Sequence, residues 1–224
     1  MPIKIESHPS ASGIFTITNP NSSTPRVITL PDAATTLVGT DVTQTLTNKT
    51  LSGGTVTGAT ISGSTIQGGG LTLGTAVAST SGTFIDFTGV PSWAKRVTVM
   101  FNGVSTNGTS PIQVQLGDSG GVETTGYAAA ASQSNSTALL TQVTTGFPIL
   151  LTTTAAGLNY GVITLSSLGS NAWVSNGVFY SSIGVNYTTS GSKTLSDTLN
   201  QVRITTVNGT DTFDAGTINI MWEG

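Results

Sequence analysis

The chain has 224 residues, only 8% of them charged, seven Lys plus Arg residues, no Cys and a formal net charge of −3. Seven cations cannot neutralise many phosphates, so we expect no nucleic-acid partner, and without Cys there are neither disulfides nor thiolate metal ligands. No run of 18 apolar residues occurs, which predicts no membrane span.

Thr, Ser, Gly, Val and Ile dominate the sequence, and Asn-Gly pairs punctuate it. β-Branched residues suit pleated strands and lose rotamer freedom in helices. Almost no segment carries the Ala, Leu, Glu and Lys mixture of a surface helix. The composition therefore predicts an all-β chain.

Residues 1–44 contain two short strand candidates, in GIFTITNP and RVITLP, joined by a turn-like loop between Pro20 and Pro25. Two short strands cannot form a stable core alone. We expect this segment to be a β arm that docks on a partner, and its only His, His8, to belong to that arm.

Residues 45–74 contain a five-residue register of apolar side chains. As a linker, the Gly and Ser residues would only supply flexibility; as structure, one apolar residue per pentad would point inward, with Gly at each corner. Four pentads make just one coil of a β-helix, which has nothing to stack on, whereas three parallel chains could share one axis. We prefer an intertwined trimeric shaft, and its axial positions are Leu51, Val56, Ile61, Ile66 and Leu71.

Residues 75–224 predict about eight strands at short spacing, which is typical of a β-sandwich or jelly roll. Within 112–116 the alternation predicts that Gln113 and Gln115 face outward. Turns are predicted at the Asn-Gly pairs 102–103, 107–108, 176–177 and 208–209, and the alanine run 127–133 is the one helix candidate. The strand candidates are 83–87, 96–101, 112–116, 148–153, 160–165, 177–187, 201–207 and 217–222.

The stretch from Thr124 to Ser192 contains no Asp, Glu, Lys or Arg. A monomer normally uses charge to keep that much surface soluble. The stretch is therefore expected either to be buried between subunits or to present a neutral Ser, Thr and Asn face to solvent.

TLTNKTL at 45–51, followed by Gly, Thr and Ile repeats, resembles a motif of tail-fibre and related appendage proteins of tailed bacteriophages. Residues 15–39 resemble short modules near the N-termini of such fibres, and residues 84–127 resemble a C-terminal domain of some of them. The resemblance implies a homotrimeric virion fibre, assembled in the host cytoplasm, fixed to other virion proteins by residues 1–44 and presenting the C-terminal domain outward.

GDSGG at 117–121 matches the nucleophile loop of chymotrypsin-like serine proteases, whose Ser needs a His within hydrogen-bond reach. Because His8 is distant in sequence, we predict a Gly-rich turn after the strand 112–116, no catalytic residue and no enzyme. Four acids (Asp118, Glu123, Asp211 and Asp214) lack a Ca²⁺-loop pattern and are expected to be solvated, so neither metal nor cofactor is predicted.

Trp173 lies between turn residues in GSNAWVSNG and is the predicted receptor contact, since amphipathic rings suit sugar faces. Three functions stay open at this point. The first is a trimeric fibre whose tip binds host surface polysaccharide. The second is a purely structural head, collar or baseplate decoration without a receptor, and the third, least favoured, is an enzyme acting on envelope material.

Overall fold

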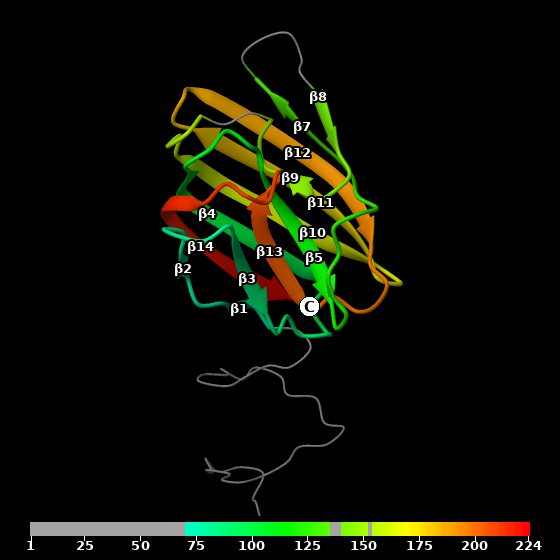
Figure 1. Cartoon of the computed structure of the whole chain (residues 1–224). Helices are drawn as coiled ribbons and strands as arrows, with labels where there is room; N and C mark the ends of the chain where they lie inside the picture. The colour runs from blue at the N-terminus through cyan, green and yellow to red at the C-terminus, as the bar shows by residue number, and fades with distance from the viewer. Residues whose placement is uncertain (1–69, 135–139, 152–153) are drawn as a thin grey trace, which may run out of the picture. The chain divides into compact units, whose positions relative to one another are not determined.

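The computed structural model (Figure 1) describes residues 70–134, 140–151 and 154–224, and the statements below concern these ranges. They form fourteen β-strands in two antiparallel sheets and contain no helix. Accordingly, no helix among them is long and apolar enough to cross a membrane. The all-β prediction is thus confirmed for this part of the chain, while the arm 1–44 and most of the shaft range lie outside the described residues.

The larger sheet has nine strands, and its central four are joined side by side in antiparallel pairs. The C-terminal strand β14 pairs with β4 on one side and with the two short N-terminal strands β1 and β2 on the other. Its order is β1 (Thr72–Leu73), β14 (Phe213–Glu223), β4 (Arg96–Thr106), β10 (Asn159–Gly169), β11 (Ala172–Ser181), β12 (Val185–Thr194), β7 (Ala128–Gln133) and β8 (Leu140–Val143), and β2 (Val77–Ala78) also pairs with β14.

The smaller sheet has five strands and lies in front of the larger one in Figure 1. Its order is β3 (Phe84–Thr88), β13 (Gln201–Thr206), β5 (Ile112–Asp118) and β6 (Gly121–Val122), and β9 (Phe147–Pro148) pairs with β5. The boundary predicted between residues 74 and 75 falls between β1 and β2, which both pair with β14.

The hydrophobic core lies between the two sheets, as the period-two burial of the strands requires. In β4, Val97 and Val99 are fully buried, and in β5 Ile112, Val114 and Leu116 are fully buried against them from the other sheet. Phe101 and Phe179 meet edge to face, with ring centroids 5.4 Å apart. Two opposed apolar faces therefore make a β-sandwich, in agreement with the predicted class.

Tight turns connect the central strands of the larger sheet. Ser170 and Asn171 join β10 to β11 with φ values of 49° and 60°, and positive φ at both central residues is the signature of a type I′ hairpin. A three-residue turn, 182–184, joins β11 to β12 and ends on Gly184 at φ 86°. β11 and β12 thus form one hairpin with both long strands in register.

Several predicted element boundaries are wrong. The segment 177–187, predicted as one strand, contains the turn between β11 and β12; of 148–153, only Pro148 is in a strand among the described residues. The helix candidate 127–133 is strand β7, because Ala129 pairs with Gly191 of β12 so closely that a Cβ on Gly191 would lie 2.6 Å from the Ala129 Cβ. Tertiary pairing has overridden the helical propensity of alanine.

Only two of the four Asn-Gly pairs lie outside strands, as predicted. Asn208-Gly209 forms the predicted turn after β13, with Gly209 at φ 68°, and Asn107-Gly108 follows the end of β4. The other two predictions are wrong: Asn102-Gly103 lies within β4 at a bulge, and Asn176-Gly177 lies within β11. Gly177 is needed there because a Cβ would lie 2.8 Å from the Val162 carbonyl oxygen.

Candidate functional site

A groove of about 480 Å³ crosses the outer face of the smaller sheet, within the size range of small-molecule sites, ~300–1,000 Å³. Its floor comes from β13 and β5, one wall from the start of β3, and the opposite wall from the loops that precede β7 and β9. The turn after β13 closes one end. The lining residues are Thr83, Phe84, Gln113, Gln115, Thr124, Thr125, Thr145, Arg203, Thr205, Thr206, Val207, Asn208 and Gly209.

Gln113 and Gln115 lie on the outer face of β5, as the alternation predicted, but they do not reach solvent. The segment before β9 covers them, and they are 1% and 5% exposed. Gln113 Oε1 accepts a bond from Thr145 Oγ1 at 2.9 Å, and Gln115 Nε2 donates to the Thr145 carbonyl at 2.8 Å. Buried amides are thus held in one orientation by the segment that forms the groove wall.

The groove floor also contains Arg203, which is the one charged residue in its lining. Arg203 Nε and Nη2 donate to the two carboxylate oxygens of Asp86 at 2.7 and 2.6 Å, a bidentate pair between β13 and β3. This hydrogen bonding raises the pKa of Arg203, against the opposing effect of burial. Because Asp86 neutralises the guanidinium, the groove carries almost no net charge.

Phe84 supplies an aromatic surface beside the floor. Its side chain is 49% exposed, and the Arg203 guanidinium carbon lies 4.0 Å from the ring centroid. The ion pair with Asp86 holds the Arg203 guanidinium in place against the Phe84 ring, where it forms a cation–π contact. One edge of the groove therefore offers an accessible apolar plane next to hydrogen-bonding groups.

Hydroxyl groups line the rest of the groove, and several already donate inward. Thr205 Oγ1 donates to the Thr83 carbonyl at 2.8 Å, and Thr206 Oγ1 donates to Asn208 Oδ1 at 2.7 Å. Asn208 Oδ1 also accepts from the N–H of Thr210 and Asp211, which fixes the turn. Thr205 and Thr206 are buried and build the floor, whereas Thr124, Thr125 and Asn208 are the exposed polar side chains of the lining.

The loop 122–126, which forms one wall, is anchored from behind by a cluster around Glu123. Its carboxylate pairs with Lys193 of β12 and accepts bonds from the Ser196 N–H and hydroxyl at 2.7 and 2.8 Å. Tyr127 adds a bond from its hydroxyl to the Glu123 carbonyl at 3.0 Å, and Lys193 Nζ lies 5.3 Å from the Tyr127 ring centroid. The wall is thus tied to the larger sheet.

The acids of this cluster have pKa values below their ordinary range. Burial acts to raise the pKa of Glu123, but the donors Lys193 and Ser196 outweigh it. The Ser196 hydroxyl, at 2.6 Å, followed by the Gly120 N–H, lowers the pKa of Asp118. The prediction of solvated loop acids is therefore wrong for Asp118, which is 3% exposed and held by protein donors.

The other two acids are Asp211, between β13 and β14, and Asp214, at the start of β14. Asp211 accepts bonds from Ser110 N–H at 2.9 Å and Asn208 Nδ2 at 2.6 Å, and Asp214 accepts from the Ser105 hydroxyl. Within residues 70–134, 140–151 and 154–224, no group of three or more His, Asp or Glu side chains is placed to hold a metal ion.

The GDSGG motif forms the predicted Gly-rich turn, which is confirmed. Asp118 pairs with Gly121 across a tight hairpin between β5 and β6. Ser119, at its tip, is exposed, and its hydroxyl lies 3.5 Å from Asp197 Oδ2. His8 lies outside the described residues.

The predicted receptor contact, Trp173, lies in strand β11, so the prediction that it lies in a loop is wrong. Its side chain is 5% exposed and belongs to the hydrophobic core. The ring therefore offers almost no surface to a ligand. Of the predicted shaft positions, Leu51, Val56, Ile61 and Ile66 lie outside the described residues, and Leu71, just before β1, is 64% exposed.

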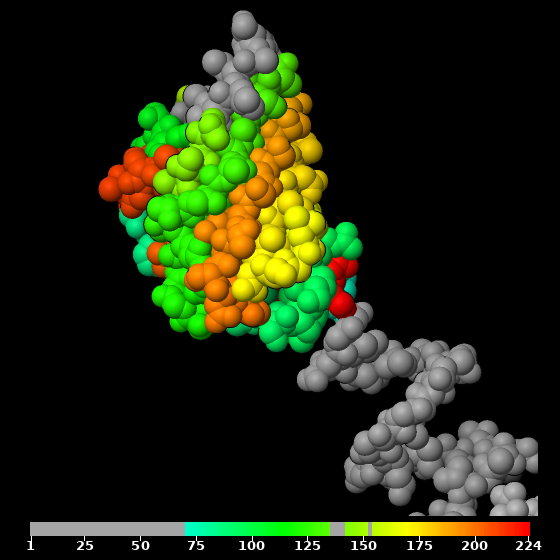
Figure 2. Space-filling model, turned by 90° about the vertical axis from the view of Figure 1, so that its right-hand side faces the viewer, coloured from blue at the N-terminus to red at the C-terminus, as the bar shows by residue number. Residues whose placement is uncertain are grey.

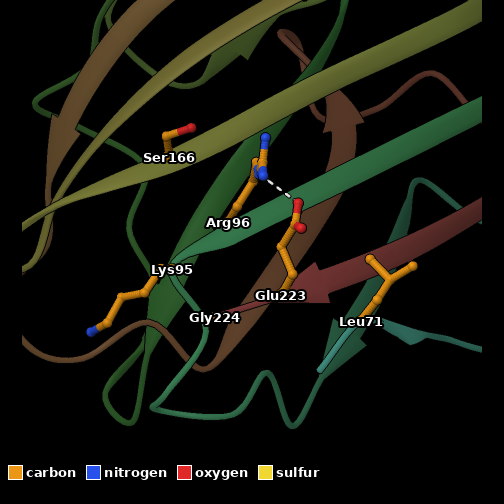
Figure 3. Close-up of a pocket in the computed structure, with 6 residues that line it drawn as sticks. All are labelled: Leu71, Lys95, Arg96, Ser166, Glu223 and Gly224. Carbon is orange, nitrogen blue, oxygen red and sulfur yellow. Dashed lines mark ion pairs between the residues drawn. The ribbon is translucent and has the colours of Figure 1, made fainter. Parts of the chain in front are cut away.

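Leu71 borders a second hollow, of about 460 Å³, at one end of the larger sheet (Figure 3). There, Arg96 of β4 pairs with Glu223 of β14, and Lys95 points away from this pair. The Arg96 side chain is 55% exposed and that of Glu223 is 35% exposed, so solvent screens the ion pair and it contributes little to stability. The hollow lacks an oriented floor comparable to that of the groove, and we regard the groove as the candidate site.

The groove residues were not predicted from the sequence, with the exception of the turn at Asn208. Nothing in the sequence of β3 marks Phe84, its first residue, as a binding residue. Arg203 is a single cation in a strand whose residues alternate between buried and partly exposed, a pattern that is common in any sheet. The signal that could have found the site is Gln113 and Gln115, two amides in an otherwise apolar strand. Comparisons with protein-family models, curated proteins and solved structures found no match for this chain.

Proposed function

We propose that the chain is a homotrimeric bacteriophage virion fibre whose C-terminal sandwich binds uncharged saccharides of the host surface in the groove of the smaller sheet. The observation that carries the binding function is the groove itself: an almost neutral polar lining in which Thr124, Thr125 and Asn208 are exposed beside the exposed ring of Phe84. The fibre assignment is supported by the resemblance around TLTNKTL and the pentad register.

The groove's chemistry matches that of a neutral sugar. Sugar hydroxyls both donate and accept hydrogen bonds, and the exposed Thr124 and Thr125 hydroxyls of the lining can do both as well. The C–H face of a sugar ring is apolar and suits the exposed plane of Phe84. An anionic ligand has less to gain, because the single cation, Arg203, is already paired with Asp86.

The groove is also prepared for binding before any ligand arrives. Bonds within the protein fix the buried floor residues Gln113 and Gln115 and the exposed Asn208, so the shape of the groove changes little on association. Three grooves on one fibre would add avidity through high effective concentration. Individually weak sites are then sufficient for attachment to a repetitive polysaccharide.

The binding function is tested with the full chain on an array of purified bacterial polysaccharides, both neutral and acidic. We expect binding to neutral members and loss of at least tenfold in affinity for Phe84→Ala. Ile183→Ala is the matched control, because Ile183 is 43% exposed in the turn between β11 and β12, away from the groove. Equal binding by both variants would refute the groove as the binding site, and no binding at micromolar protein would favour the decoration protein without a receptor.

The trimer is tested separately by light scattering of the full chain. The sequence predicts a trimer, and Ile61→Asp is expected to impair assembly because three carboxylates would meet at one apolar axis. A monomeric wild-type chain would refute the fibre assignment. A trimer that Ile61→Asp leaves intact would favour the linker reading of residues 45–74.

A further inference from the structure

The outer face of the larger sheet carries an apolar row that runs across four neighbouring strands. Met100 of β4 pairs with Val162 of β10, Val162 pairs with Val178 of β11, and Val178 pairs with Thr188 of β12. Val162 and Val178 are 43% and 59% exposed. Cross-strand partners lie close together, so these side chains form one continuous patch.

An aromatic pair extends this patch by one row. Tyr160 and Tyr180 are cross-strand partners on the same face, with stacked rings whose centroids are 6.3 Å apart. Tyr180 is 48% exposed, and Tyr160 contacts the bulge at Gly103, where an added Cβ would lie 3.6 Å from its ring. An exposed ring, stacked on a partly buried one, beside exposed valines is an unusual composition for the solvated face of an antiparallel sheet.

The same face lacks the charges that keep a solvated sheet soluble. Strands β10 and β11 and the outward positions 186–192 of β12 lie in the stretch Thr124–Ser192, which has no Asp, Glu, Lys or Arg. Around them, Arg96 and Glu223 stand at one end of the sheet and pair with each other. Figure 2 shows part of this sheet from one side, where β12, in orange, lies between the yellow β10–β11 and green strands in a continuous surface.

The size of the face matches what a stable contact between proteins requires. Five strands, from β14 to β12, span about 24 Å at ~4.8 Å each, and ten residues extend about 33 Å at ~3.3 Å each. The product, about 800 Å², is close to the ~800 Å² that each partner contributes to a standard interface. A sugar chain would cover only a fraction of this area.

We infer that the outer face of the larger sheet is the surface through which the C-terminal sandwiches of neighbouring copies of this chain contact one another. The inference rests on the proposed trimer. It leaves the groove accessible, because the groove lies on the outer face of the smaller sheet, on the opposite side of the core. In the proposed trimer the copies would also meet at high effective concentration, so a contact of modest intrinsic affinity suffices.

The absence of Cys allows a direct test with single-cysteine variants of the full chain. Val178→Cys places a thiol in the centre of the face, and Thr88→Cys places one on the exposed outer face of the smaller sheet as the matched control. We expect a maleimide reagent to modify Val178→Cys at least tenfold more slowly than Thr88→Cys. Dilution that dissociates the copies should remove this protection.

A second pair of variants, Val178→Lys and Thr88→Lys, tests the same contact without a reagent. We expect the unfolding temperature of wild type and Thr88→Lys to rise with protein concentration, and that of Val178→Lys to depend less on it, since only associated copies gain stability by mass action. Val178 is exposed in one sandwich, so Val178→Lys should still fold.

The outcomes separate this inference from the proposed function. Equal modification rates for Val178→Cys and Thr88→Cys in a chain that light scattering shows to be trimeric would overturn the inference and leave the fibre proposal standing. A monomeric chain would overturn both. Protection of Val178→Cys that appears only on adding a polysaccharide would identify the face as a ligand surface, and this too would overturn the inference.

Discussion

The pair of Lys193 and Glu123 provides the sharpest test of how the groove is held, because it anchors a wall without contacting the groove itself. The Lys193 side chain is 6% exposed and the Glu123 side chain 23% exposed. Lys193→Met keeps the length of the aliphatic stem and removes the ammonium group. It leaves a mostly buried carboxylate without its cation, while the two bonds from Ser196 remain.

The expected cost follows from these contacts. Removing one partner of a buried ion pair costs about 3–5 kcal/mol, and we place this pair at about 2–3 kcal/mol because Glu123 is partly exposed and keeps Ser196. Loss of the cation–π contact with Tyr127 adds about 0.5–1 kcal/mol. The sum, about 3 kcal/mol, corresponds to a fall in melting temperature of about 6–12 °C for a domain of this size.

The assay is urea unfolding of the full chain followed by tryptophan fluorescence, together with thermal unfolding. Lys95→Met is the matched control, because Lys95 is exposed, and it should change the unfolding free energy by less than about 0.5 kcal/mol. The double variant Lys193→Met/Glu123→Gln should recover about 1–2 kcal/mol, since it removes the unpaired charge. Saccharide affinity should fall in Lys193→Met as the wall 122–126 loosens. A loss below about 1 kcal/mol with no coupling in the double-variant cycle would refute the reasoning.

Three further predictions concern acid, glycine and the protease-like turn. The pKa of Glu123 is lowered in the folded state, so the stability that its ionised form contributes is complete above its ordinary pKa of 4.5 and is lost as the pH falls through the lower folded value. In unfolding experiments between pH 7 and pH 3, we therefore expect the urea concentration at the midpoint to decrease once the pH is below about 4.5. This decrease should be less steep in Ser196→Ala, which lacks one donor to Glu123. Gly216 has φ 97°, and a Cβ there would lie 2.4 Å from the Gly103 carbonyl oxygen, whereas Gly89 has φ 78° and nothing within 4 Å of an added Cβ. Gly89→Ala should therefore lose about 1 kcal/mol of unfolding free energy through backbone strain alone, and Gly216→Ala should lose more. Equal losses would contradict the close contact at Gly216. Ser119→Ala should leave the unfolding free energy within about 0.5 kcal/mol, and a hydrolytic activity abolished by this variant would show that the turn is catalytic.

Strand content was predictable wherever a strand is buried on one face and polar on the other. β4 and β14 alternate along their central residues; composition indicated an all-β chain, and the short spacing of the strand candidates indicated the sandwich. The alanines of β7 gave no such signal, because alanine suits a helix locally and forms a strand here only through its close pairing with Gly191. Asn176-Gly177 likewise reads as a turn, although Gly177 is required by a close approach to a neighbouring strand.

The candidate site was largely hidden from sequence reasoning, since it depends on which segment covers which face. Gln113 and Gln115 follow an outward-facing pattern correctly, yet the segment before β9 buries them. Trp173 stands among turn-forming residues, but its position in β11 directs the ring into the core. Arg203 and Asp86 are 117 residues apart, and only the pairing of β13 with β3 brings them together.

If the chain is the fibre proposed above, the position of β3 in the sequence directly after the N-terminal strands has a mechanical consequence. Residues 72–79 run beside β14, and the groove wall begins at Thr83 and Phe84. Tension between a ligand held at Phe84 and a tether at the N-terminal side therefore passes through about a dozen residues, and hydrogen bonds from Leu73 to Ser79 onto β14 resist it. The hairpin of β11 and β12 lies outside that load path. Under such tension the chain would thus yield first at β1 and β2, and the bulk of the sandwich would stay folded around the proposed ligand.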